Sequence, residues 1–253
     1  MKRYTTVLFV AMLTLLLATA CHQKSFTISG TITGGEGKSL YLEELTPNGP
    51  LFIDSIALDG RGHYKYTYRM PYRSLYNLHT TADNYAVILP DYGEKIVLDA
   101  NYANLSMTYD VSGSPESILL WQLQDYTNDG SRLIIELVDT TQHYSQLLAG
   151  GLITAAEQKA KKAETDSIYR LAFEAQQQYI CRFIEENSGS LATLIALYKP
   201  FNNRSLITPE NGFDYYELVL EGLQEQCPEN PHTIHFKNTV ERLRFQLAQQ
   251  QAQ

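Results

Sequence analysis

Polar and apolar residues alternate along the first half of the chain, from Phe26 to Val111. Alternation with a period of two places the apolar side chains on one face of a strand, and turn residues interrupt the pattern at short intervals. We expect eight short strands, at residues 26–32, 40–42, 52–58, 64–68, 75–79, 85–89, 96–98 and 105–111. This pattern predicts an antiparallel β-sandwich.

Helical spacing replaces this alternation after Val111 and continues to the end of the chain. Ser114 before Pro115 marks a helix start, because serine caps a first turn and proline fits its first position. Further helices are expected from Thr154, whose capping box with Glu157 opens a helix to about residue 187, at 190–198, at 208–227, and from 233 onwards. A break is expected at residues 128–130, Asn-Asp-Gly. The predicted fold class is α+β, an N-terminal antiparallel β-sandwich followed by an α-helical region.

The first residues have the organisation of a secretory signal peptide. Lys2 and Arg3 precede an apolar run at residues 7–17, which is about half the length needed to cross a bilayer. The segment 17–21, Leu-Ala-Thr-Ala-Cys, resembles the bacterial lipobox, in which the cysteine receives fatty acyl chains such as palmitate. We expect a lipoprotein signal peptide at residues 1–20 and a lipid anchor on Cys21, which would hold the protein at the periplasmic face of the cell envelope. The alternative is an ordinary cleaved signal with an incidental cysteine.

After the signal peptide, we expect two parts, a β-sandwich domain at residues 21–113 and a helical region at residues 114–253. Composition and charge exclude several classes of function for them. The chain is 44% apolar and 19% charged, which is typical of a globular protein. A formal net charge of −8 without a basic run argues against nucleic acid as a partner and against membrane binding by charge alone. The sequence contains neither a nucleophile elbow nor a glycine-rich phosphate loop, so we expect no cofactor and no catalytic residue.

Two alternatives are open for Cys181 and Cys227. An oxidising envelope permits a disulfide between them, which would stabilise the fold by about 4 kcal/mol in the chain-entropy model. Cys181 also lies beside an apolar helical stripe, which favours a buried free thiol.

The histidines and paired carboxylates that could bind a metal or act in catalysis are better explained as ordinary surface residues. His232 and His235 lie one helical turn apart, downstream of Cys227, but the set lacks a fourth ligand and the usual spacing of a zinc site. A solvated helix terminus is therefore the favoured interpretation. The carboxylate pairs 43–44 and 185–186 are predicted to be surface charge, because neighbouring side chains diverge on a strand or a helix.

Eighteen tyrosines invite a binding hypothesis. Tyr64, Tyr66 and Tyr68 share one face of a predicted strand, and Tyr76 belongs to a neighbouring strand. Such a row could form a platform for sugars, peptides or lipids. Aromatic residues at period two are more often the buried face of a sandwich, and that interpretation is favoured.

Several segments together resemble a domain of unknown function that precedes thioredoxin-like domains in cell-envelope thiol-disulfide oxidoreductases of Bacteroidota. The matching segments are Phe26-x-Ile28-x-Gly30-x-Ile32, Leu40-Tyr41-Leu42, Ile53-Asp54-Ser55, Asp59-Gly60-x-Gly62-His63-Tyr64, Ser74-Leu75-Tyr76, Val111-Ser112-Gly113-Ser114 and Glu186-Asn187-Ser188-Gly189-Ser190. The resemblance implies a sandwich followed by helices. The redox motif Trp-Cys-x-x-Cys of the longer relatives is missing, since Trp121 is the one tryptophan and no Cys-x-x-Cys occurs. The catalytic residues of those relatives therefore have no positions in this sequence.

These observations favour a non-catalytic lipoprotein that acts as a binding or scaffold module in the cell envelope. Its expected partners are the membrane, through the lipid anchor, and an envelope protein such as a thioredoxin-like subunit. One alternative is the scaffold half of a thiol-disulfide oxidoreductase whose thioredoxin-like domain is lost or separate. Another is a carbohydrate-binding accessory protein that uses the tyrosine face.

Overall fold

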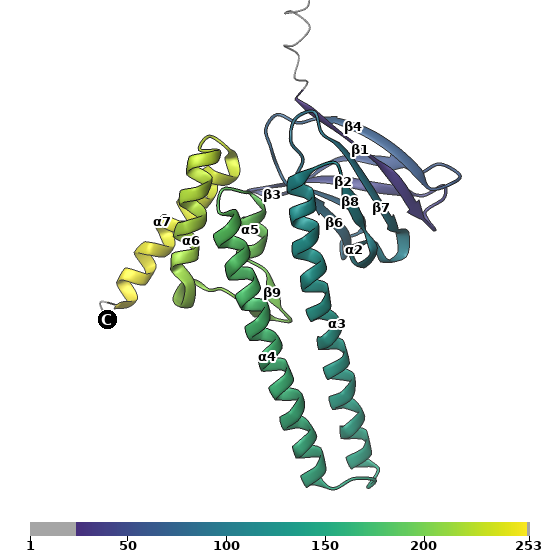
Figure 1. The fold of residues 1–253 in the computed structure, drawn as a ribbon, viewed down its shortest axis with the longest axis vertical. Helices are drawn as coiled ribbons and strands as arrows, with labels where there is room; N and C mark the ends of the chain where they lie inside the picture. Colours follow the sequence, from purple (N-terminus) through teal and green to yellow (C-terminus); the bar gives the residue numbers. More distant parts are fainter. Residues whose placement is uncertain (1–23, 252–253) are drawn as a thin grey trace, which may run out of the picture.

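The computed structural model describes residues 24–251 as two β-sheets followed by a helical region (Figure 1). This arrangement confirms the predicted α+β fold class, with sheets first and helices after. The last strand of the sheets ends at Ser112 and the first long helix begins at Pro115, which agrees with the expected change near residue 113. The predicted signal peptide and Cys21 lie outside the described residues.

The first sheet has the strand order β4-β1-β7-β8. Its strands are β1 (Ser25–Thr33), β4 (His63–Arg69), β7 (Lys95–Asn101) and β8 (Asp110–Ser112). β1 pairs antiparallel with β4 but parallel with β7, so this sheet is mixed rather than purely antiparallel. Gly30 lies where β1 approaches β7, and a side chain there would collide with the carbonyl group of Leu98.

The second sheet has the order β3-β2-β5-β6, and all its neighbours are antiparallel. Its strands are β2 (Ser39–Thr46), β3 (Gly49–Ala57), β5 (Tyr76–Thr81) and β6 (Asn84–Ile88). Alternate residues of both sheets meet in one buried cluster, as the period-two pattern predicts. Phe26 and Ile28 of β1 lie in this cluster with Leu40 and Leu42 of β2.

The predicted eighth strand is wrong over most of its length. Residues 102–108 form a short 3₁₀ helix, η1 (Tyr102–Asn104), and one turn of helix, α2 (Leu105–Thr108). The side chain of Asn101 accepts a hydrogen bond from the backbone of Ala103 and caps η1. Such local side-chain bonds compete with strand pairing, so only the three residues of β8 join the sheet.

Helix α3 (Pro115–Ala149) begins as predicted, with Ser114 as its N-cap and Pro115 in its first turn. The break expected at residues 128–130 does not occur, because tertiary contacts override local propensity. Asn128 is buried and donates to the carbonyl oxygen of Ser106 at 3.2 Å. Gly130 lets Gln176 and Phe201 approach the helix closely.

Helix α4 (Ala155–Asn187) runs antiparallel to α3, and its predicted capping box is confirmed. The Thr154 hydroxyl accepts from the Glu157 amide at 3.2 Å, and the Glu157 carboxylate accepts from the Thr154 amide at 2.8 Å. The outer parts of the two helices extend beyond the rest of the molecule (Figure 1). We call this extension, residues 131–173, the arm.

Of the three remaining helices, the first two pack against the inner part of α4, and the last packs against the second. They are α5 (Ala192–Leu197), α6 (Pro209–Gln226) and α7 (Pro231–Gln251), and a small hairpin of β9 (Pro200–Phe201) and β10 (Arg204–Ser205) joins α5 to α6. Their apolar faces form a second buried cluster, which also contains Leu75 and Leu89 from the sandwich. On α7, Val240 is buried and Leu243 and Leu247 are half-buried. None of the helices between residues 24 and 251 combines the length and the apolar character that a membrane crossing requires.

Candidate functional site

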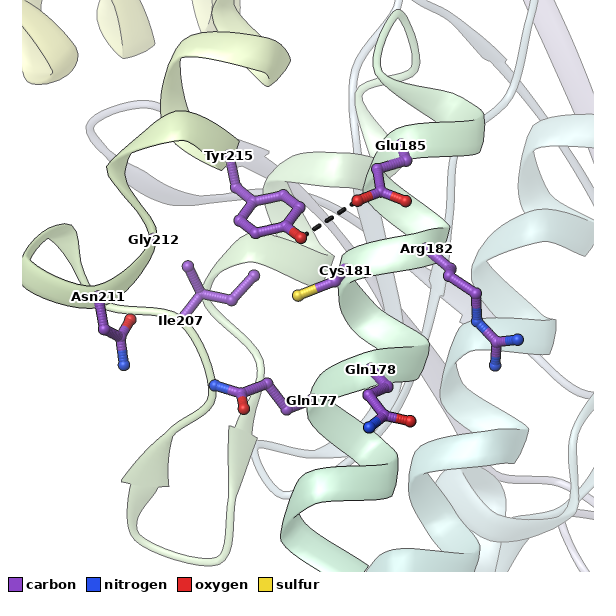
Figure 2. Close-up of a pocket in the computed structure, with 9 residues that line it drawn as sticks. All are labelled: Gln177, Gln178, Cys181, Arg182, Glu185, Ile207, Asn211, Gly212 and Tyr215. Carbon is purple, nitrogen blue, oxygen red and sulfur yellow. Dashed lines mark hydrogen bonds between the residues drawn. The ribbon is translucent and has the colours of Figure 1, made fainter.

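Cys181 lines an open pocket of 470 Å³ between α4 and the start of α6. Helix α4 supplies Cys181 and Glu185, one turn apart on the same helix face, and α6 supplies Tyr215. The Tyr215 hydroxyl donates a hydrogen bond to the Glu185 carboxylate at 3.1 Å (Figure 2). A thiol, a phenol and a carboxylate therefore meet at this pocket.

The electrostatics of this trio favour a protonated phenol. The adjacent Cys181 side chain raises the pKa of Tyr215 above its ordinary value of 10.0, and burial and the Glu185 carboxylate raise it further. Tyr215 is thus a neutral hydrogen-bond donor and not a base at physiological pH. Sequence analysis did not find this pairing, because Tyr215 is distant from Cys181 in the chain.

The pocket lacks the imidazole that activates a cysteine nucleophile, because no histidine is among its lining residues. Within residues 24–251, Cys181 and Cys227 are not bonded to each other, and both thiols are half-buried. The structure therefore has free thiols at both positions and not the alternative disulfide. The Cys227 sulfur lies 3.4 Å from the Thr233 hydroxyl instead.

The tyrosine row faces the sandwich interior rather than an open surface. Tyr64 and Tyr76 are buried, and Tyr66 and Tyr68 are half-buried. The Tyr64 hydroxyl donates to the carbonyl oxygen of Leu98 at 3.0 Å, and the rings of Tyr68 and Tyr76 pack edge to face with centroids 5.8 Å apart. Tyr76 is not on a strand next to that of the other three, as the sequence suggested, because β4 and β5 belong to opposite sheets, and its ring meets Tyr68 across the core.

His232 is not the solvated residue that the sequence suggested. It is buried, and its Nε2 atom lies 2.9 Å from the Ser74 hydroxyl oxygen. The Asn230 amide donates to the carbonyl oxygen of Arg73 at 2.7 Å and accepts from the His232 backbone at 2.9 Å. These bonds join the start of α7 to the sandwich. His235, by contrast, is exposed.

Glu44 is buried, with 3% exposure, so the prediction that the carboxylate pair at 43–44 is surface charge is wrong for this residue. It lies close enough to His232 to raise the pKa of the imidazole, against the larger, opposite effect of burial. Ser74, His232 and Glu44 thus bring together the group types of an acyl-transfer triad. Ser74 is completely buried, so its hydroxyl has no access to a substrate, and the cluster is structural.

The arm carries an apolar groove of 380 Å³ between α3 and α4. Leu137 and Val138 of α3 and Tyr169 of α4 form much of its wall. Val138 is 55% exposed, and Ile135 on the same helix is 62% exposed. Exposed apolar side chains beside an apolar groove are typical of an interaction surface.

Across residues 24–251, no cluster of three or more histidine, cysteine or acidic side chains has the arrangement of a metal site. Comparison with models of known protein families, with curated proteins and with solved structures found no match. The resemblance to the domain of unknown function therefore stays a prediction that rests on the sequence motifs.

Proposed function

We propose that this chain is a lipid-tethered protein of the cell envelope that binds a partner protein and catalyses no reaction itself. The observation that best supports the proposal is the arm, whose apolar groove lies open between two antiparallel helices. An amphipathic helix is the occupant that fits this geometry, because a third helix completes the apolar seam of a two-helix hairpin. The partner is an envelope protein that contributes such a helix.

The direction of the arm supports a tethered mode of action. β1 starts at Ser25, four residues after the predicted lipidation site at Cys21. The start of β1 and the α3–α4 connection lie at opposite ends of the molecule (Figure 1). α3 alone, with 35 residues, is about 52 Å long at 1.5 Å per residue. A protein held by Cys21 would present the groove well away from its anchor.

Site-specific crosslinking tests the partner. A photoreactive amino acid replaces Val138 in the groove, or Lys65 on the exposed side of β4 as a control, in cells that make the lipidated protein. We expect one discrete protein adduct from position 138 and none from position 65. A Val138→Asp variant should lose the same partner on co-purification, whereas Phe245→Asp, at an equally exposed apolar residue of α7, should keep it. Retention of the partner by Val138→Asp would contradict the arm as binding site.

Two further measurements address the tether and the absence of catalysis. A Cys21→Ala variant should leave the detergent phase after phase partitioning, and a variant that stays there would contradict the lipid anchor.

The purified mature chain should not reduce insulin disulfides with turnover, and such turnover would contradict a non-catalytic role. A thioredoxin-like adduct at position 138 would identify the partner expected from the sequence resemblance.

A further inference from the structure

A second cavity, of 530 Å³, lies where α3 and α5 cover one end of the β3-β2-β5-β6 sheet. Part of its wall is apolar, with Leu45 and Val87 from the sheet and Leu194 and Ile195 from α5, and polar side chains of α3, Gln124, Thr127 and Ser131, form another part. Volumes of this size are typical of small-molecule sites. The cavity shares no lining residue with the Cys181 pocket, and it adjoins the groove of the arm at Asn202, which lines both.

Lys199 is the one charged residue that lines this cavity, and none of the lining residues is acidic. Its ammonium group donates to the Gln124 side-chain oxygen at 2.6 Å. Among residues 24–251, no carboxylate forms an ion pair with Lys199. Burial alone lowers the pKa of the ammonium group to about 8. The cation is therefore partly desolvated without compensation by a negative charge, which costs stability.

The surroundings of Lys199 fix the direction of its contact with Gln124. The Gln124 amide nitrogen donates to the Asn128 side-chain oxygen at 2.6 Å, so its carbonyl oxygen must face the lysine. An ammonium group has three N–H donors, and Gln124 is its only hydrogen-bond partner in the part of the chain that the structure describes. Two donors are left for a ligand.

Asn77 supplies a second unused polar group at the same cavity. Its side chain lies on β5, and its Oδ1 atom is buried without a hydrogen-bond partner among the described residues. An unpaired buried acceptor costs about 1–3 kcal/mol, so native proteins rarely keep one without a reason. Because this oxygen is enclosed, a ligand in the cavity does not reach it, and Lys199 is the polar group that faces the ligand.

We propose that this cavity binds a small organic monocarboxylate, with its carboxylate on Lys199 and its apolar body between the sheet and α5. One cation without an acidic neighbour is complementary to a single negative charge. The apolar wall favours a hydrocarbon or aromatic body over a sugar. The site thus adds a small-molecule function to the partner binding proposed for the arm.

Ligand titration tests the proposal on the full mature chain. The probes are cinnamate and octanoate, each paired with its uncharged primary amide, and binding is followed by the amide signals of α5 and β5 in NMR spectra. We expect at least one carboxylate to bind with a Kd of about 1 mM or tighter and its amide to bind at least about tenfold more weakly. The better of the two carboxylates identifies an aromatic or an aliphatic body.

Variants assign the effect to Lys199. Lys199→Met should lose the preference for the carboxylate over the amide, whereas Lys65→Met, at an exposed lysine outside the cavity, should keep it. Melting curves of both variants show whether they are folded. The proposal is overturned if carboxylate and amide bind the wild-type chain equally, if neither carboxylate binds at about 10 mM, or if folded Lys199→Met keeps the preference. All of these measurements use the purified chain without a partner protein, so their outcome does not depend on the proposed partner binding.

Discussion

His232 shows how one buried side chain makes the stability of this protein depend on pH. Burial lowers the pKa of its imidazole below the ordinary value of 6.5, the positive charge of nearby His235 acts in the same direction, and Glu44 opposes them. The folded protein therefore keeps a neutral His232 under conditions in which the unfolded chain is already protonated. Since the unfolded state then binds more protons, the contribution of His232 to stability is complete above pH 6.5 and is lost as the pH falls.

We expect the melting temperature to fall as the pH is lowered from 7 to 5, with a slope from this group of no more than about 1.4 kcal/mol per pH unit. His232→Gln should melt at a lower temperature at pH 7, because its bond with Ser74 is altered, and should show a smaller decrease towards pH 5. His143→Gln, at an exposed position of α3, is the control and should keep the wild-type profile. An unchanged profile in His232→Gln would show that other groups cause the acid sensitivity.

Gly222 shows that the packing between elements can outweigh helix propensity. It lies inside α6, where a Cβ atom would meet the backbone of Ser188 and Gly189 at the end of α4. Alanine in place of glycine would gain up to about 1 kcal/mol of helix propensity, but the backbones would have to separate. Close approach at this crossing therefore requires glycine.

We expect Gly222→Ala to destabilise the protein by about 1–3 kcal/mol, as overpacking does elsewhere, measured by urea unfolding. Gly150→Ala is the matched control at the end of α3, because its φ of −79° suits alanine and its nearest neighbour would be 3.5 Å away. That variant should be neutral or slightly stabilised. A Gly222→Ala protein as stable as Gly150→Ala would contradict the close crossing.

The capping box of α4 acts at the tip of the arm. Thr154→Ala removes the hydroxyl that accepts from the Glu157 amide, a change that costs about 1 kcal/mol of helix stability. We expect faster hydrogen exchange in the first turns of α4, with little change in global stability, because the tip is remote from both buried clusters. Thr141→Ala, at an exposed threonine of α3, should leave exchange in α4 unchanged. Equal exchange in wild type and Thr154→Ala would show that the cap contributes nothing.

At the scale of the whole molecule, local patterns predicted the order and most of the limits of the elements. Alternation predicted the strands of the sandwich, and caps such as Ser114 and Thr154 predicted the starts of α3 and α4. The failures, at residues 105–108 and 128–130, occur where contacts from distant parts of the chain or side-chain caps decide the conformation. The parallel pairing of β1 with β7 is likewise a long-range feature that periodicity cannot reveal.

The candidate sites could be predicted from the sequence less well than the fold. Cys181 was identified as a residue of interest, but its neighbour Tyr215 was not. Lys199 meets Gln124 across 75 positions of the chain, and the amide oxygen of Asn77 is unpaired only in the folded structure. Burial of a charge or an amide is a property of packing, so the residue types alone could not indicate a site at Lys199 and Asn77.

The two buried clusters are continuous enough to predict that the sandwich and the helical region unfold together. Leu89 follows β6 in the sandwich, yet its fully buried side chain belongs to the helical cluster. Its backbone amide donates to the Ser117 hydroxyl of α3 at 3.1 Å, and Asn230 and His232 add bonds from α7. We expect a single unfolding transition, with the same midpoint for the NMR amide signals of the sandwich strands and the helical signal in circular dichroism. Leu89→Ala should lower the free energy of unfolding by about 2–5 kcal/mol while both signals still change together. Two separated transitions in the wild-type chain would mean that the sandwich and the helices are independent domains, and that the bonds of α7 to the sandwich contribute little to either.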